Sequence, residues 1–241
     1  MTFLRSLLFL IGAVPITAVF GIGVPISGLF GKRAALWMAR EWARWMVRWC
    51  EWSCGIRYEV HGWENVPKTP AVIMAKHQSA WETLFIEATF PYQCWIIKRE
   101  LLWLPFVGWG LAAVRSIAID RKSGVAAREQ IVQQGMQRIA DGLWVTIFPE
   151  GTRVRVGKRG RYGIGGATLA TRTGTPIMPV AHNAGEFWGR NAFRKHAGTV
   201  QVVIGPPIET KGRDAVSVTR EVEEWIEGEM VKLNPERYAG P

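Results

Sequence analysis

The feature that most restricts the fold of this chain is a long uncharged segment near its start. Residues 6–31 are 26 positions without one charged side chain, and about 20 apolar residues suffice for a helix to cross a bilayer. Proline removes a helix hydrogen bond and clashes with the preceding turn. Prolines and glycines interrupt the segment at Pro15, Gly21, Gly23, Pro25 and Gly28. We therefore expect two short helices, over about 3–14 and 17–30, that form a hairpin embedded in the membrane.

The charges beside this segment indicate which side of the membrane it faces. Arg5 precedes the segment, and Lys32, Arg33 and Arg40 follow it. Positively charged flanks favour the cytoplasm, so both ends are predicted to stay there. Because prolines are tolerated in some true spans, a single crossing is one alternative. A secretory signal peptide is the other, but the segment is long for one and no A-x-A cleavage site follows it.

The next segment, 32–52, has the pattern of an amphipathic helix. One face gathers tryptophans at spacings of three and four: Trp42, Trp45, Trp49 and Trp52. A stripe beside it gathers arginines at a spacing of four: Arg40, Arg44 and Arg48. Tryptophan prefers the headgroup region and arginine pairs with lipid phosphate, so we predict a membrane anchor over residues 1–54. The alternative is a core-facing helix with an ordinary solvated basic side.

From residue 55 onward, short β-rich runs alternate with helical segments. Strand patterns lie at 56–60, 71–75, 94–98, 114–119, 144–148, 176–181 and 200–204. Helical patterns lie at 81–90, 124–140, 167–173 and 214–232. This alternation is typical of an α/β domain built around a sheet. Residues 55–241 are therefore predicted to form one such domain behind the anchor.

The composition excludes several classes of protein. Apolar residues make up 48% of the chain, which excludes global disorder. Thirty Lys and Arg against twenty Asp and Glu give a net charge of +10, which suits nucleic acid or anionic lipid. Because no basic patch accompanies a known reading element, we expect no nucleic-acid partner. Three cysteines without C-x-x-C spacing and four histidines without ligand spacing indicate a reducing compartment and no metal site.

The first candidate for chemistry is the segment from Lys76 to Glu82, which follows an apolar strand and opens a helical stretch. If the chain turns between His77 and Glu82, the carboxylate accepts a hydrogen bond from one imidazole nitrogen. That contact fixes the tautomer and leaves the other nitrogen free to take a proton. The pair is thus a candidate for activating a hydroxyl nucleophile. Taken alone, a histidine with a carboxylate five residues later is a commonplace pattern.

The second candidate is the segment from Phe148 to Arg153, directly after another apolar strand. Pro149 and Gly151 favour a turn that exposes backbone N–H groups and directs Thr152 and Arg153 toward one anion. Arginine is suited to bidentate phosphate binding. A run of basic residues without an acidic one follows, which on its own is more typical of a solvated loop than of a site.

A third candidate begins with Lys98 and Arg99 at a strand end and continues into an apolar Pro/Gly loop that ends at Trp109. Two cations beside an apolar loop suit an anionic headgroup next to a lipid tail. An aromatic-covered exit from a strand has the same pattern.

In this order and spacing, the three segments resemble the motif blocks of the glycerolipid acyltransferase family. Within that family the resemblance is to the 1-acyl-sn-glycerol-3-phosphate (lysophosphatidic acid) acyltransferases, and it covers about residues 70–183. Residues 77–82, 98–108 and 148–153 are similar to the first three blocks, and 176–180 to the fourth. One departure is Glu82, where the family usually has Asp. The resemblance implies a mixed sheet flanked by helices, and bacterial members have a similar pair of N-terminal helices.

The resemblance also implies roles for the candidate residues. His77 is expected to act as general base on the 2-hydroxyl of lysophosphatidic acid, with Glu82 orienting its ring. Arg153 is expected to hold the substrate phosphate. The residues of its turn, and a lysine from the second block, complete the expected phosphate site: Glu150, Gly151, Thr152 and Lys98. The longer side chain of Glu82 is expected to alter geometry and rate rather than the type of reaction.

The partners implied by the resemblance are lysophosphatidic acid, a membrane, and acyl-CoA or acyl carrier protein as donor, with no cofactor. The implied product is phosphatidic acid for phospholipid biosynthesis. The implied location is a bacterial inner membrane, with the catalytic domain on the cytoplasmic face. Alternatives are another lysophospholipid, glycerol 3-phosphate or a lyso-aminolipid as acceptor, and a non-catalytic membrane-surface protein. Intact candidate residues at His77, Glu82 and Arg153 argue against the last of these.

Overall fold

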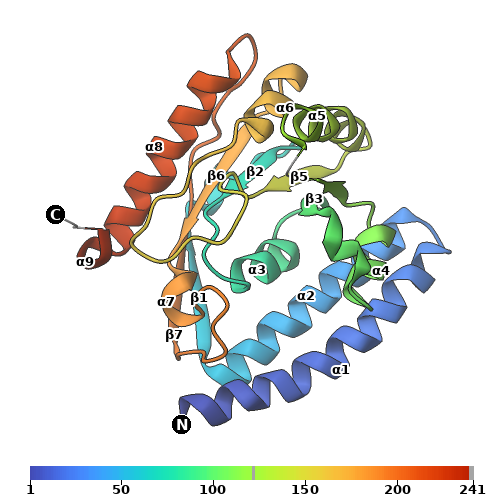
Figure 1. Cartoon of the computed structure of the whole chain (residues 1–241), viewed down its shortest axis with the longest axis vertical. Coiled ribbons are helices and arrows are strands. Elements are labelled where there is room, and N and C mark those ends of the chain that lie inside the picture. Colours follow the sequence, from blue (N-terminus) through green and yellow to red (C-terminus); the bar gives the residue numbers. More distant parts are fainter. Residues whose placement is uncertain (121–122, 239–241) are drawn as a thin grey trace.

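The computed structural model describes residues 1–120 and 123–238. Within them a seven-stranded sheet has the order β1-β7-β6-β2-β5-β3-β4, with helices on both faces (Figure 1). β6 and β7 pair antiparallel, and the other neighbours pair in parallel. The strands are β1 (Ile56–His61), β2 (Val72–Ala75), β3 (Gln93–Lys98), β4 (Ile117–Ile119), β5 (Trp144–Ile147), β6 (Ile177–His182) and β7 (Gly198–Ile204). The predicted mixed α/β sheet is therefore confirmed.

The helices divide between the two faces of the sheet. In chain order they are α1 (Thr2–Gly28), α2 (Lys32–Cys54), α3 (Trp81–Thr89), α4 (Val107–Ala113), α5 (Val125–Ala140), α6 (Gly165–Thr173), α7 (Ala184–Phe187), α8 (Ala215–Leu233) and α9 (Pro235–Tyr238), with 3-10 turns η1 (Trp63–Asn65) and η2 (Arg99–Trp103). Alternate strand residues point to opposite faces. Ile73 and Ala75 of β2 join a core with α2 and α3, whereas Val72 and Met74 join one with α5, α6 and α8.

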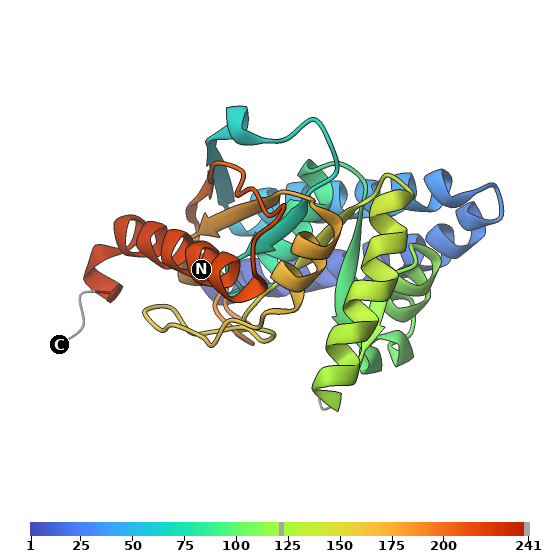
Figure 2. The same cartoon turned by 90° about the horizontal axis from the view of Figure 1, so that it is seen from above.

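The predicted break in the uncharged segment is wrong. α1 is one helix that contains both Pro15 and Pro25. It packs along α2 as a hairpin that lies against the domain (Figures 1 and 2). Two of its glycines serve close packing rather than helix ends, because a Cβ at Gly12 would lie 2.2 Å from the Trp49 ring and one at Gly21 2.4 Å from Phe106. Packing against neighbouring helices compensates the helix for the hydrogen bonds that proline removes.

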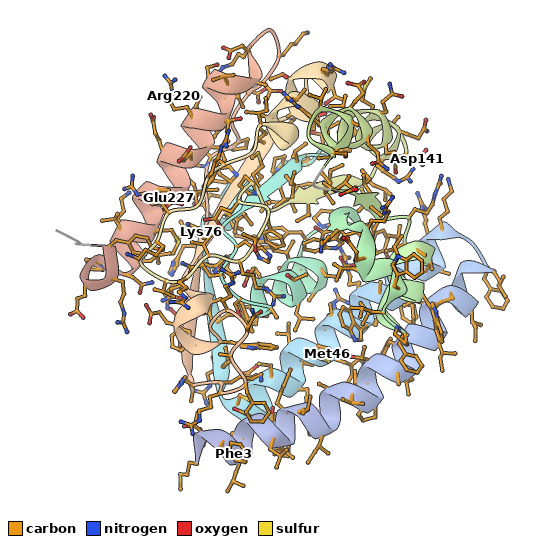
Figure 3. All side chains as sticks on the ribbon, viewed as in Figure 1. Phe3, Met46, Lys76, Asp141, Arg220 and Glu227 are labelled. Carbon is orange, nitrogen blue, oxygen red and sulfur yellow. The ribbon has the colours of Figure 1, made fainter. Side chains whose placement is uncertain are left out.

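The outer face of α1 is apolar and uncovered. Leu4, Ile11, Val14 and Val19 are each at least 60% exposed, and α1 alone among the described helices is long and apolar enough to cross a membrane. Figure 3 shows the contrast between Phe3 of α1, which is exposed, and Met46 of α2, which is buried. The hairpin predicted within residues 3–30 is therefore wrong, and the N-terminal hairpin is formed by α1 and α2 instead.

The arginine and tryptophan faces of α2 differ from the predicted interfacial stripes. Trp42 and Trp49 donate their indole N–H groups to Thr17 and to the Phe9 carbonyl of α1, while Trp45 and Trp52 are exposed. Arg40 and Arg44 donate to the backbone carbonyls of Phe90 and Ala88 at the end of α3. Arg48 is exposed. Two of the four tryptophans therefore hold α2 to α1, and two of the three arginines hold α2 to the domain, instead of facing lipid.

The segment between β3 and β4 is more helical than predicted. The expected loop after Lys98 folds into η2 and α4, and the strand expected over 114–119 is limited to β4. Val114 belongs to the end of α4, where its backbone N–H bonds to the Gly110 carbonyl. Contacts of α4 with α1 explain the difference, because the apolar Pro/Gly segment gains a packing partner that local sequence does not reveal.

Candidate active site

The candidate residues meet at one edge of the sheet. β2, β5 and β3 run in parallel, so their carboxyl ends lie on the same side. Lys76 and His77 follow β2, residues 148–153 follow β5, and Lys98 ends β3. Ligands of α/β sheets bind in crevices outside the carboxyl ends of the strands.

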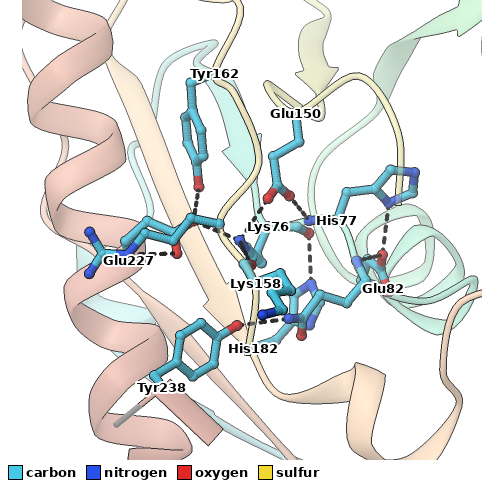
Figure 4. Close-up of polar contacts among 11 residues, drawn as sticks. Lys76, His77, Glu82, Glu150, Lys158, Tyr162, His182, Glu227 and Tyr238 are labelled. Atoms are coloured by element: carbon cyan, nitrogen blue, oxygen red, sulfur yellow. Dashed lines mark hydrogen bonds and ion pairs between the residues drawn. The ribbon is translucent and has the colours of Figure 1, made fainter. Parts of the chain in front are cut away.

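His77 and Glu82 form a hydrogen-bonded pair. Nδ1 of His77 lies 2.8 Å from Oε1 of Glu82, and a dashed line in Figure 4 marks this contact. The ring of Phe148 stacks on the imidazole at 3.8 Å between centroids and 6° between planes. These contacts fix the plane and the tautomer of the ring, so Nε2 is the nitrogen left to accept a proton. The orienting contact expected from the sequence is present.

Glu82 lies buried in the first turn of α3. Its Oε1 also accepts hydrogen bonds from the backbone N–H groups of Gln78 and Ser79, at 3.0 and 2.8 Å. Burial raises the pKa of Glu82, but the charge of His182 and the hydrogen bond from His77 outweigh burial and lower that pKa overall. The carboxylate therefore stays charged and stabilises a protonated His77 ring.

A buried ion cluster joins the two motif turns to α8. Nζ of Lys76 lies 2.6 Å from Oε1 of Glu150 and 2.6 Å from Oε1 of Glu227. Each of the three side chains is at most 2% exposed. Oε2 of Glu150 accepts the backbone N–H of His77 at 2.9 Å, and Tyr162 donates to Glu227 at 3.0 Å (Figure 4). The cluster thereby positions the backbone of His77 relative to the turn after β5.

Arg153 contributes an unsatisfied cation beside His77. Its Nε is buried and has no hydrogen-bond partner among the described residues. The backbone N–H of Val154 donates to the His77 carbonyl at 2.7 Å, which ties the Arg153 segment to the catalytic candidate. A buried charged donor without an acceptor is costly, so this position favours an anionic ligand.

His77 and Arg153 line one cavity of about 330 Å³. The rest of its wall is mostly apolar and comes from α1, α2, α3, β3, η2 and α4, with contributions such as Phe20, Val24, Trp42, Ile97 and Leu111. Glu87 is the acidic residue on this mostly apolar wall. Burial raises the pKa of Glu87 to about 7, although a hydrogen bond from Trp95 and the charge of Arg40 act to lower it. An apolar cavity with a few convergent polar groups is the usual form of a site for an apolar ligand.

Other predicted phosphate ligands lie elsewhere. Lys98 is half exposed, pairs with Glu100 at 3.2 Å and is not part of the cavity wall. Thr152 is exposed. The carboxylate of Glu150 is engaged by Lys76 and by the backbone N–H of His77, so it supports the turn. Gly151 adopts φ 65° there, a backbone conformation that favours glycine.

The residues that the sequence interpretation missed are mostly distant partners. Lys76 precedes His77 and is fully buried, and its position at the end of an apolar strand was the available signal. Glu227 and Tyr162 lie outside the motif blocks and carried no signal of this kind. Within the residues that the structure describes, no group of three or more His, Cys, Asp or Glu side chains is placed to hold a metal ion.

Comparisons of the sequence with known proteins match it to acyltransferases. The family model described as "Acyltransferase" matches residues 57–183. A Pseudomonas aeruginosa protein named 1-acyl-sn-glycerol-3-phosphate acyltransferase is 42% identical over 201 residues, which are 82% of this chain and 78% of that protein. A human protein named 1-acyl-sn-glycerol-3-phosphate acyltransferase alpha is 30% identical over 79% of this chain and 68% of its own length.

One solved structure shares the fold over nearly the whole chain. It is the crystal structure of the 1-acyl-sn-glycerophosphate (LPA) acyltransferase PlsC from Thermotoga maritima. The two folds superpose with a TM-score of 0.80 and cover 97% of this chain and 96% of the other, at 21% sequence identity. The N-terminal hairpin is included in that coverage.

Proposed function

We propose, since this chain belongs to the acyltransferase family, that it transfers an acyl chain from a thioester to the 2-hydroxyl of 1-acyl-glycerol 3-phosphate and so makes phosphatidic acid. The observation that carries the proposal is the cavity that His77 and Arg153 share. It combines a candidate base for the acceptor hydroxyl, an unsatisfied cation for the acceptor phosphate and an apolar space for the acyl chains. The names of the relatives support the choice of acceptor.

In the proposed reaction, Nε2 of His77 takes the proton of the acceptor hydroxyl as its oxygen attacks the thioester carbonyl. An ester bond forms, the carbon–sulfur bond breaks, and the protonated His77 returns the proton to the departing thiolate. Glu82 stabilises the imidazolium through its 2.8 Å contact with Nδ1. No covalent acyl-enzyme is required.

Arg153 would hold the phosphate of the acceptor and so place its hydroxyl at His77. Fixing the geometry of two reactants removes much of the entropic barrier to their reaction. Acyl-CoA or acyl carrier protein would supply the thioester, with no cofactor. Phosphatidic acid is a precursor for phospholipid biosynthesis, so the product fits a membrane-bound enzyme.

The exposed apolar face of α1 supports a place at the membrane. We propose that the anchor of residues 1–54 lies in the cytoplasmic leaflet of a bacterial inner membrane and that the domain of residues 55–241 lies on the cytoplasmic side. The cavity wall includes Thr17, Phe20 and Gly21 of α1, so a lipid acceptor would reach His77 from the leaflet. Basic residues on both sides of the uncharged segment 6–31, Arg5 and Lys32 among them, favour this orientation.

The acceptor assignment is tested by a matrix of donors and acceptors on purified membranes, with wild type and Arg153→Ala. We expect wild type to prefer lysophosphatidic acid over glycerol 3-phosphate, lysophosphatidylethanolamine and a lyso-aminolipid. Arg153→Ala should raise the KM for lysophosphatidic acid by roughly 10- to 100-fold, because a charge-assisted phosphate contact is lost. Equal KM values for lysophosphatidic acid in both proteins would contradict the role of Arg153.

Membrane association is tested on the exposed face of α1. Ile11→Glu combined with Val19→Glu should move the protein from the membrane fraction to the soluble fraction, because a charge within a bilayer costs about 2.5–3.5 kcal/mol. Val216→Glu is the matched control, since Val216 is 56% exposed on α8. Sedimentation with vesicles measures the effect. Unchanged sedimentation of the α1 variant would count against the proposed seating.

A further inference from the structure

Two polar side chains on α3 line the cavity that His77 and Arg153 share, and the proposed reaction uses neither of them. Thr83 and Glu87 are four residues apart on α3, so they lie on the same face of the helix. Both belong to the cavity wall together with His77 and Arg153. α3 itself lies between α2 and the sheet (Figure 1). Thr83 and Glu87 therefore form a polar strip on a mostly apolar wall inside the protein.

The polar strip has hydrogen-bonding capacity that the protein leaves unused. The indole N–H of Trp95 donates to Oε2 of Glu87 at 2.5 Å. Within residues 1–120 and 123–238, no hydrogen bond or ion pair reaches Oε1 of Glu87 or the hydroxyl of Thr83. Polar groups removed from water cost free energy unless they are hydrogen-bonded. The strip therefore favours a ligand that places a polar group against this part of the wall.

Glu87 is a hydrogen-bond donor in a large share of molecules at neutral pH. Burial raises the pKa of Glu87 to about 7, against the hydrogen bond from Trp95 and the charge of Arg40 on α2. The titratable neighbour on β3 is Cys94, which stays neutral because burial raises its pKa to about 12. A protonated carboxyl has one O–H to donate. The strip thus presents two hydroxyl donors, one from Glu87 and one from Thr83.

Ring contacts connect the polar strip to the reacting atoms. The Trp95 ring lies 5.7 Å from the Phe148 ring, and Phe148 stacks on His77 at 3.8 Å between centroids. Thr83 directly follows the carboxylate that orients His77. Glu87 is about 6 Å further along the helix axis, since an α-helix rises about 1.5 Å per residue. The strip therefore begins beside the candidate base and leads away from it along the cavity.

The acceptor of the proposed reaction has a polar group that matches the strip. Besides its phosphate and its free hydroxyl, 1-acyl-glycerol 3-phosphate has an ester at carbon 1, a few bonds from the hydroxyl on carbon 2. The carbonyl of this ester accepts hydrogen bonds and donates none, so it suits two hydroxyl donors. Carbon 2 lies between the ester and the phosphate. If Arg153 holds the phosphate and the strip holds the ester, the free hydroxyl between them is fixed at His77.

We propose that Thr83 and Glu87 bind the ester carbonyl at carbon 1 of the acceptor and make the enzyme selective for 1-acyl over 1-alkyl glycerol 3-phosphate. This inference rests on the proposed function, because it concerns the same cavity and the same acceptor. A hydroxyl on the acyl chain of the donor has similar hydrogen-bonding chemistry. The test therefore includes a 3-hydroxyacyl donor as a separate arm.

The test measures the KM for 1-acyl-glycerol 3-phosphate and for its 1-alkyl ether analogue of equal chain length. Both acceptors have the same phosphate and hydroxyl, so effects through His77 and Arg153 cancel in the ratio of the two KM values. We expect wild type to have an about tenfold lower KM for the ester, as one or two hydrogen bonds allow. The double variant Thr83→Val/Glu87→Leu should make the two KM values equal. Thr89→Val is the matched control, because Thr89 is on α3 but outside the cavity wall.

Glu87→Gln tests the donor at nearly constant side-chain volume. Its amide donates at any pH, and its carbonyl oxygen can still accept the Trp95 N–H. We expect this variant to keep the preference for the ester at every pH. In wild type the preference should be largest in acid and should fall as pH rises through about 7, where Glu87 loses its proton. The same pH dependence in both proteins would assign the effect to another group and contradict the role of Glu87.

Three further results would overturn the proposal. These are equal KM values for ester and ether in wild type, an unchanged ratio in the double variant, and a double variant that changes only the use of the 3-hydroxyacyl donor. Calorimetric binding of both acceptors in detergent micelles separates this proposal from the proposed reaction. If wild type acylates neither acceptor but binds the ester more tightly than the ether, and the double variant does not, the strip assignment stands and the reaction fails.

Discussion

Replacing His77 by alanine is expected to reduce acyl transfer by about 10²- to 10⁴-fold, the range over which a general base contributes to a rate. The reason is that His77 is the titratable group on the cavity wall whose second nitrogen is oriented by a carboxylate. Without the imidazole the acceptor hydroxyl loses the base that Glu82 orients. Steady-state rates with saturating lysophosphatidic acid and acyl-CoA measure the loss in kcat.

Variants of Glu82 separate orientation from proton transfer. Glu82→Gln keeps the volume but removes the charge that stabilises the imidazolium, so kcat should fall while the KM for the acceptor stays close to wild type. Glu82→Asp restores the charge on a shorter side chain and should recover most of the rate. A His77→Ala protein with wild-type turnover would remove the proposed mechanism, and thermal unfolding of each variant checks that the fold persists.

Sequence patterns predicted the sheet because local chemistry dominates there. β2 and β5 are short, fully buried apolar runs that end in polar turns, and their carboxyl ends lie together as α/β topology requires. The His77–Glu82 contact was predictable for a similar reason. His77 follows β2 and Glu82 lies five residues later in the first turn of α3, so the geometry needed no distant partner.

Tertiary packing explains what the sequence patterns missed. Pro15 suggested a break in the uncharged segment, but α2 supports α1 along its length and the helix continues. Arg40 has the spacing of a lipid-facing stripe, yet it bonds to Phe90, 50 residues away in the chain. Local patterns carry no information about which distant surface will compete for a side chain.

The ion cluster around Lys76 is the clearest example of such a distant contact, since Glu227 lies 151 residues further along the chain. Lys76→Met is expected to lower the free energy of unfolding by about 3–5 kcal/mol at pH 7, because it leaves the buried carboxylate of Glu150 without a cation. Among the cations of the described residues, Glu227 keeps only the exposed Arg159, whose Nε lies 3.9 Å from its Oε2. Equilibrium unfolding in detergent micelles measures the loss. Lys232→Met is the matched control, because Lys232 pairs with Glu229 on α8 while 72% exposed and should change stability by less than about 1 kcal/mol.

The pH dependence of the Lys76→Met variant identifies the cause. Burial already raises the pKa of Glu150 in the presence of Lys76, and loss of the lysine charge should raise it further. A carboxyl whose pKa is higher in the folded state binds more protons when folded, so its stability contribution is greatest at low pH and falls as pH rises through the folded pKa. The variant should therefore approach wild-type stability in acid and lose it toward neutral pH.

The activity of these variants then shows whether the ion cluster around Lys76 positions His77 for acyl transfer. Glu150→Gln and Glu227→Gln added to Lys76→Met remove the buried charges and should recover much of the lost stability. The His77 backbone would still lack its ionic support, because the charged oxygen that accepts its N–H is gone. We therefore expect the triple variant to be stable but slow, with a reduced kcat. If stability and kcat instead recover together, the cluster serves the fold alone and its link to His77 has no catalytic consequence.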